Sequence, residues 1–144
     1  MKEYSFSAKQ LENSLANIKE KGITEITVND SAITSERAVF LRLLGKIRVL
    51  CPDVHFSFYL SIENIDLAVI KALAEIYSSV TIALPQNAVS DSLLRKTFNK
   101  KTNLLNEYGI VFGFSIASKF VSFKAFKSLL DFSFSMYPNH IEID

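Results

Sequence analysis

Short β-branched or aromatic runs alternate with longer amphipathic stretches at a nearly constant interval, and this repeat restricts the possible fold more than any other feature. Five runs have the length and residue types of strands, at 23–30, 54–60, 79–84, 110–117 and 140–143. Their starts are 31, 25, 31 and 30 residues apart. This interval fits one strand, one helix and two loops, so the sequence predicts parallel strands joined by right-handed crossovers.

Five amphipathic segments are expected to form helices, at 7–21, 35–50, 65–77, 90–108 and 122–136. Asn64 is expected to cap the third helix, Ser90-Asp91 to begin the fourth and Gly109 to end it. The second to fourth strands are apolar enough to be covered on both faces. The 144 residues contain no linker, so we expect one domain over residues 1–144.

Two architectures fit this order of elements: an open doubly wound sheet and a piece of a β/α barrel. The first strand of a doubly wound fold normally ends in a glycine-rich phosphate loop, but here it ends in Val28-Asn29-Asp30-Ser31-Ala32. Five strands are too few for an eight-stranded barrel of about 250 residues. The sequence therefore predicts an α/β fold, an incomplete TIM-like β/α barrel with five parallel strands in sequential order and helices on the outer face.

Composition excludes several functional classes. Sixteen Lys and Arg against fifteen Asp and Glu leave a net charge of +1, which favours neither nucleic acid nor an anionic membrane as a partner. One Cys excludes a disulfide framework, and two His disfavour a His-rich metal site. No apolar run approaches the roughly 18 residues of a membrane span, and 1–5 (MKEYS) lacks an apolar signal segment. We expect a cytoplasmic protein.

Several phrases, in order and at consistent spacing, resemble the core of the radical S-adenosylmethionine (radical SAM) superfamily, in the branch that includes cobalamin-linked members and methylthiotransferases. They are 7–26 (SAKQLENSLANIKEKGITEI), 28–34 (VNDSAIT), 56–72 (FSFYLSIENIDLAVIKA), 108–114 (YGIVFGF) and 128–143 (SLLDFSFSMYPNHIEI). The resemblance covers about the whole chain and implies a six-stranded partial barrel that lacks its first strand.

The departures from this family concern its chemistry. Its Cys-x3-Cys-x2-Cys loop holds a 4Fe–4S cluster with three thiolates and leaves one iron open to S-adenosylmethionine; that motif is absent here. The family's ligand-bearing strand ends are altered at Leu60 or Ser61, at 83–87 (ALPQN) and at 117–122 (ASKFVS). The resemblance therefore implies the cluster and S-adenosylmethionine for the parent family only. We expect no catalytic residue, metal ligand or cofactor in this chain alone.

Few single residues are candidates for a functional site. Asp30, at the end of the first strand, is the one candidate for cofactor binding, with a turn or helix cap as its alternative role. Cys51 is expected to pack as a small hydrophobe. Glu63 and Asp66 flank a helix start, where carboxylates favour the helix dipole.

Two further groups have more ordinary interpretations. His55 and His140, 85 positions apart, are expected to be structural, and no Ser–His–Asp arrangement is recognisable. The basic run at 95–101 (RKTFNKK) lies on a predicted helix and is expected to be a solvated face rather than an RNA contact.

Three functional hypotheses remain. In the first, the chain is a central piece of a radical SAM enzyme without its cluster loop. Alternatively, it is a degenerate radical SAM-like domain that binds a protein partner or a small ligand at the C-terminal ends of its strands. In the third, it is an unrelated α/β binding module. We favour the first for the family's function and the second for what this chain itself does, because its loop ends have lost the family's ligands.

Association is also expected, as a homodimer or as docking onto another domain. The predicted order leaves two edge strands, which begin near Ile23 and His140. The resemblance implies that the first, at 23–30, has lost its neighbour, and Glu25 and Asp30 alone blunt its edge. An apolar inner wall would add to the contact. It is expected to contain Phe56, Phe58 and Ile82, or the residues that alternate with them, together with Phe112 and Phe114.

Overall fold

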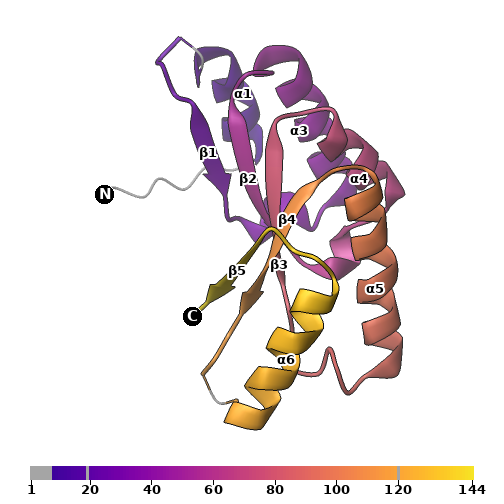
Figure 1. Cartoon of the computed structure of the whole chain (residues 1–144). Coiled ribbons are helices and arrows are strands. Elements are labelled where there is room, and N and C mark those ends of the chain that lie inside the picture. Colours follow the sequence, from indigo (N-terminus) through magenta and orange to yellow (C-terminus); the bar gives the residue numbers. More distant parts are fainter. Residues whose placement is uncertain (1–7, 19, 120) are drawn as a thin grey trace.

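The structure, a computed structural model, describes residues 8–18, 20–119 and 121–144 and contains one parallel five-stranded sheet (Figure 1). The strands are β1 (Glu25–Val28), β2 (His55–Leu60), β3 (Ser78–Ala83), β4 (Val111–Ile116) and β5 (His140–Ile143). The helices are α1 (Ala8–Ile18), α2 (Ser31–Thr34), α3 (Arg37–Leu50), α4 (Leu67–Ala74), α5 (Ser92–Glu107) and α6 (Phe123–Ser135), with a 3₁₀ turn, η1 (Ile62–Asn64).

The strands lie in the order β1-β2-β3-β4-β5, and the described part of the chain does not pair β1 with β5. Sequential parallel strands with crossovers of one hand place the connecting helices on one side of the sheet, as Figure 1 shows. The predicted incomplete TIM-like barrel, with five parallel strands and helices on the outer face, is confirmed.

The core lies between the sheet and these helices. The strand register aligns two apolar rows on the helix-facing side, and the members of these rows in β2, β3 and β4 are fully or almost fully buried. The rows are Val28, Phe58, Val80 and Phe112, and Leu60, Ile82, Phe114 and Ile141. Buried aliphatic residues of the helices, such as Leu43, Ile70 and Leu105, complete this core.

The opposite face of the sheet corrects two expectations. The strands were predicted to be covered on both faces, but the alternate residues of β2 are only partly buried and are polar: His55, Ser57 and Tyr59. The predicted apolar inner wall is also wrong, because all five of its named residues are fully buried in the helix-covered core: Phe56, Phe58, Ile82, Phe112 and Phe114. The physical reason is the two-residue period of a strand, which gives each face its own set of side chains.

Helix ends confirm most of the expected caps. Asp91 caps α5 by accepting hydrogen bonds from the N–H groups of Leu93 and Leu94, and Gly109, with φ of 70°, follows its end. Asn64 does not cap α4: it lies in η1, and Asp66 takes the cap position. Within the described ranges, no helix is long and apolar enough to cross a membrane.

Candidate functional site

The open face of the sheet carries a cluster of hydrogen-bonding side chains over its C-terminal half. Strand register places Tyr59, Thr81, Gly113 and His140 in one row across β2 to β5. His140 Nε2 lies 2.9 Å from Thr81 Oγ1, although β4 separates their strands. The ring of His140 therefore reaches across the backbone of β4.

Gly113 makes this crossing possible. A Cβ atom at this position would lie under 3.0 Å from both the ring and the backbone carbonyl of His140, closer than real Cβ atoms come to other atoms. Any other residue at 113 would displace the His140 side chain or separate β5 from β4. Glycine is thus required here by close approach and not by an unusual φ.

A second polar contact spans β2 to β5. The Tyr59 hydroxyl lies 3.0 Å from each carboxylate oxygen of Glu142, to which it donates its hydrogen bond. Burial raises the pKa of Tyr59, and the hydrogen bond to Glu142 and the negative charges of Glu142 and Asp144 raise it further. The phenol is therefore held neutral, as a donor, beside an acidic pair.

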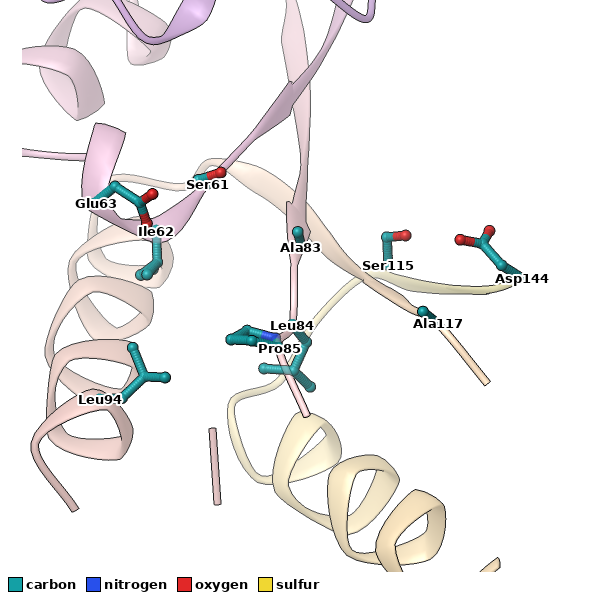
Figure 2. Close-up of a pocket in the computed structure, with 10 residues that line it drawn as sticks. All are labelled: Ser61, Ile62, Glu63, Ala83, Leu84, Pro85, Leu94, Ser115, Ala117 and Asp144. Atoms are coloured by element: carbon teal, nitrogen blue, oxygen red, sulfur yellow. The ribbon is translucent and has the colours of Figure 1, made fainter. Parts of the chain in front are cut away.

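A pocket of about 550 Å³ lies at the C-terminal ends of the strands (Figure 2). Its walls come from the ends of β2, β3, β4 and β5 and from the first turns of η1 and α5: Ser61, Ile62, Glu63, Ala83, Leu84, Pro85, Leu94, Ser115, Ala117 and Asp144. Figure 2 shows Glu63 on one side of the pocket and Asp144 on the other. The arrangement is an apolar hollow with a carboxylate at each of two sides, at the end where β/α barrels place their active sites.

Lys101 of α5 holds the η1 wall of this pocket in place. Its Nζ donates a hydrogen bond of 2.8 Å to the carbonyl of Ile62. Burial lowers the pKa of Lys101, while the charges of Asp66 and Glu63 oppose that shift. This ammonium is thus hydrogen-bonded to the backbone of η1 and lies in the electrostatic field of two carboxylates.

Asp30, the sequence candidate for cofactor binding, is the N-cap of α2. Its Oδ1 accepts a hydrogen bond of 2.9 Å from the N–H of Ala32. This is the alternative role expected for it, and Asp30 is not among the residues that line the pocket. A role of Asp30 in cofactor binding stays a prediction.

Glu63 and Asp66 have different positions. Asp66 caps α4 by accepting from the N–H of Val69 at 3.0 Å and lies 2.6 Å from Arg37 Nε. These two contacts lower the pKa of Asp66, the hydrogen bond from Val69 more than that from Arg37. Glu63 sits in the first turn of η1 and lines the pocket. Sequence reasoning placed Glu63 beside a helix start and gave it a helix-dipole role, because nothing local showed that the segment before the helix forms a pocket wall.

The residues present do not fit a 4Fe–4S cluster. Cys51, the one cysteine in the sequence, is fully buried and donates a hydrogen bond of 3.0 Å to the carbonyl of Leu15. It follows α3 and precedes β2, so it lies at the opposite end of the sheet from the pocket. In the described ranges, no group of three or more His, Cys, Asp or Glu side chains has a metal-binding arrangement.

The two histidines and the basic run are also placed by the structure. His55 and His140 lie on the open face but in different rows, since His55 pairs in register with Glu25, while its ring packs 4.7 Å from that of Tyr77. In the basic run, Phe98 is fully buried while Arg95, Lys96 and Lys100 are exposed. The aromatic ring is thus unavailable for stacking on a base.

The fold is similar to that of SuiB from Streptococcus suis. No protein-family model and no curated protein matches the sequence significantly. The SuiB crystal structure aligns over 96% of this chain with a TM-score of 0.75 and 15% identity. The structures of SuiB bound to S-adenosylmethionine and to the precursor peptide SuiA each align over 99% of this chain, again with a TM-score of 0.75 and 15% identity.

At this identity, the likeness establishes the fold and not the chemistry. The chain spans about a third of SuiB, 33% or 34% of that chain depending on the structure. The chain therefore has the fold of about a third of SuiB, and its function has to be argued from the residues of the pocket and the open face.

Proposed function

We propose that this chain is a radical SAM-like domain that binds a small ligand in the pocket at the C-terminal ends of its strands and does not itself perform radical chemistry. The pocket carries this proposal, because it occupies the end of the sheet where barrel enzymes bind substrates while the chain supplies no set of thiolates. Its fold relative SuiB is bound to S-adenosylmethionine in one structure, which supports that molecule as the first ligand to test.

The chemistry of the pocket favours a ligand with an apolar body and a positive charge. Ile62, Leu84 and Leu94 offer apolar contacts, and Glu63 and Asp144 offer carboxylates on two sides. S-Adenosylmethionine carries a sulfonium and an ammonium group, whereas S-adenosylhomocysteine lacks the sulfonium charge. Tighter binding of the first ligand is therefore expected.

Isothermal titration calorimetry with both ligands tests this proposal. Ala83→Phe fills the pocket from the end of β3 and should weaken binding at least about tenfold, since it removes apolar contacts worth about 1.4 kcal/mol or more. Val111→Phe is the matched control, because Val111 lies on the same open face at the other end of the sheet. Equal binding by both variants, or no binding of either ligand by the wild-type chain, would contradict the proposal.

A second candidate function is to serve as part of a longer radical SAM enzyme whose cluster thiolates come from outside this sequence. The observation that favours it is the length relation, since the chain spans about a third of SuiB. Anaerobic reconstitution with iron and sulfide, applied to the product of the whole reading frame, distinguishes the two. One cluster per chain supports the enzyme, and its absence supports the non-catalytic domain.

A protein ligand is the remaining form of the proposal. SuiB is bound to its precursor peptide SuiA in one structure, and the open face here displays partly buried hydrogen-bonding side chains such as Ser57 and Ser79, which lie 3.2 Å apart. A peptide over Ser57 and Ser79, in the N-terminal halves of β2 and β3, would be displaced by Ser57→Phe and much less by Ala83→Phe at the C-terminal end of β3. Pull-down of one defined peptide with both variants reads out that difference.

A further inference from the structure

A groove of about 390 Å³ runs between α6 and the outer side of β5, away from the pocket described above. Leu130, Phe134, Pro138, Ile141 and Ile143 contribute apolar walls. Two of these side chains are largely exposed, Phe134 to 60% and Ile143 to 54%. The neighbouring Tyr137 is 79% exposed, so large apolar side chains concentrate along this border of the molecule.

The same border is a free strand edge. Strand β5 pairs with β4, and no described strand pairs with its other side. Soluble proteins usually protect such an edge with lysine, proline or a bulge, but the four residues of β5 are His-Ile-Glu-Ile. By contrast, the β1 edge exposes Glu25 and Thr27.

Strand β5 is also held rigidly in its sheet. His140 is anchored on Thr81 and Glu142 on Tyr59, so both polar side chains of the strand are tied back over the open face. A strand that is already fixed loses little conformational entropy when it pairs.

We propose that this edge is the interface of a two-fold symmetric dimer, in which β5 pairs antiparallel with β5 of a second copy and Phe134 covers the groove. A second copy is the occupant because the surface is self-complementary and the net charge of +1 gives two copies little reason to repel one another.

Side-chain chemistry selects the register. A two-fold axis perpendicular to the sheet places the helix-covered faces of both copies on the same side. Even-numbered residues of β5 then lie opposite even-numbered residues of the second copy, and odd-numbered residues opposite odd-numbered ones. With Ile141 opposite itself, His140 faces Glu142 of the second copy, and Ile141 meets its own equivalent on the helix-covered face. A shift to place Glu142 opposite itself would bring two carboxylates together, which is unfavourable.

The exposed aromatic area on this border is large enough to form a substantial part of a dimer interface. At about 150–250 Å² per aromatic side chain, the exposed parts of Phe134 and Tyr137 come to roughly 200–350 Å² per copy. A stable interface buries roughly 800 Å² per partner, so these two side chains would supply about a third of it, and paired backbone and Ile143 add to them.

Light scattering and sedimentation across a concentration series test the association. We expect a species of twice 16.2 kDa for the wild type. Phe134→Glu and Ile143→Lys should each raise the dissociation constant at least about tenfold, since both place a charge in an apolar contact. The control Phe123→Glu changes an 83%-exposed side chain in the first turn of the same helix and should leave the mass unchanged.

Cysteine cross-linking tests the register. Directly opposed residues of antiparallel strands have Cα atoms about 4.5–5.5 Å apart, which suits a disulfide. Ile141→Cys should therefore oxidise to a covalent dimer, whereas Glu142→Cys and the β1 control Thr27→Cys should not. A monomeric wild type at all concentrations overturns the interface. A dimer that Phe134→Glu leaves intact does the same, and cross-linking through Thr27→Cys would assign the contact to β1 instead.

Discussion

Replacing Gly113 by alanine should destabilise the protein although the change adds a single methyl group. The new Cβ would lie under 3.0 Å from the ring and the carbonyl of His140. Overpacking of this kind costs about 1–3 kcal/mol, and loss of the Thr81–His140 hydrogen bond costs about 1 kcal/mol more. Alanine also reduces the conformational entropy of the unfolded chain, which favours folding by about 0.4–1 kcal/mol. The net loss in the free energy of unfolding is therefore about 1–3 kcal/mol.

Urea denaturation followed by circular dichroism measures this loss. With a slope of about 2 kcal/mol per molar urea, the midpoint should fall by about 0.5–1.5 M. Gly45→Ala is the matched control, because no atom lies within 4 Å of the added Cβ in α3, and alanine should there stabilise the helix by about 0.5–1 kcal/mol.

The double variant Gly113→Ala/His140→Ala isolates the cause. Removing the imidazole ring removes two of the three closest contacts of the added Cβ and leaves that with the His140 carbonyl. The double variant should therefore lose less free energy of unfolding than the two single variants lose together. A Gly113→Ala protein as stable as the wild type would refute the view that this glycine is needed for the crossing of His140.

Three other outcomes follow from named contacts. Glu12, whose carboxylate binds Arg42 at 2.9 Å and Lys46 at 3.2 Å, has its pKa lowered, by the Arg42 hydrogen bond above all, against an opposing effect of burial. The stabilisation by the Glu12 carboxylate should be complete above the ordinary carboxyl pKa range and lost as pH falls through the lowered pKa. Glu12→Gln should lower the free energy of unfolding by about 1–2 kcal/mol at neutral pH. The same variant should show a weaker loss of stability at acid pH. Asp91→Ala should cost about 1 kcal/mol in thermal or urea unfolding, because two N–H groups of α5 lose their cap. Asp131→Ala, at an exposed position within α6, serves as the comparison. The phenol of Tyr59 should ionise above the ordinary tyrosine pKa range in an ultraviolet titration. Its stabilising effect is therefore present below that range and lost as pH rises through the raised pKa. Glu142→Gln should move the midpoint of this titration back toward the ordinary range.

The sequence predicted the framework of this protein well and the ends of its elements less well. Strand β5 was predicted with its observed bounds, while the strand expected at 23–30 is shorter, at Glu25–Val28. The helix expected at 35–50 is preceded by the separate short helix α2, which Asp30 begins. Ends depend on which residue takes the cap, and competing caps such as Asn64 and Asp66 lie only two positions apart.

The candidate functional site was harder to predict from the sequence than the fold. The alternation of polar and apolar residues in β2 was visible in the sequence, but it did not say which set faced the helices. The partners of the open-face cluster are 59 positions apart for Thr81 and His140 and 83 apart for Tyr59 and Glu142. No local pattern connects such pairs, and the requirement for glycine at 113 follows only from the place of His140.

What the sequence determined by itself is therefore the class and order of the elements, because strand and helix periodicities are local properties of consecutive residues. It also determined that one thiol is available, whereas the family's cluster loop uses three. Tertiary structure alone decided that His140 reaches across Gly113 to Thr81 and that an apolar groove lies between α6 and β5. These facts depend on strand register and crossover direction, which bring together side chains that the sequence keeps far apart.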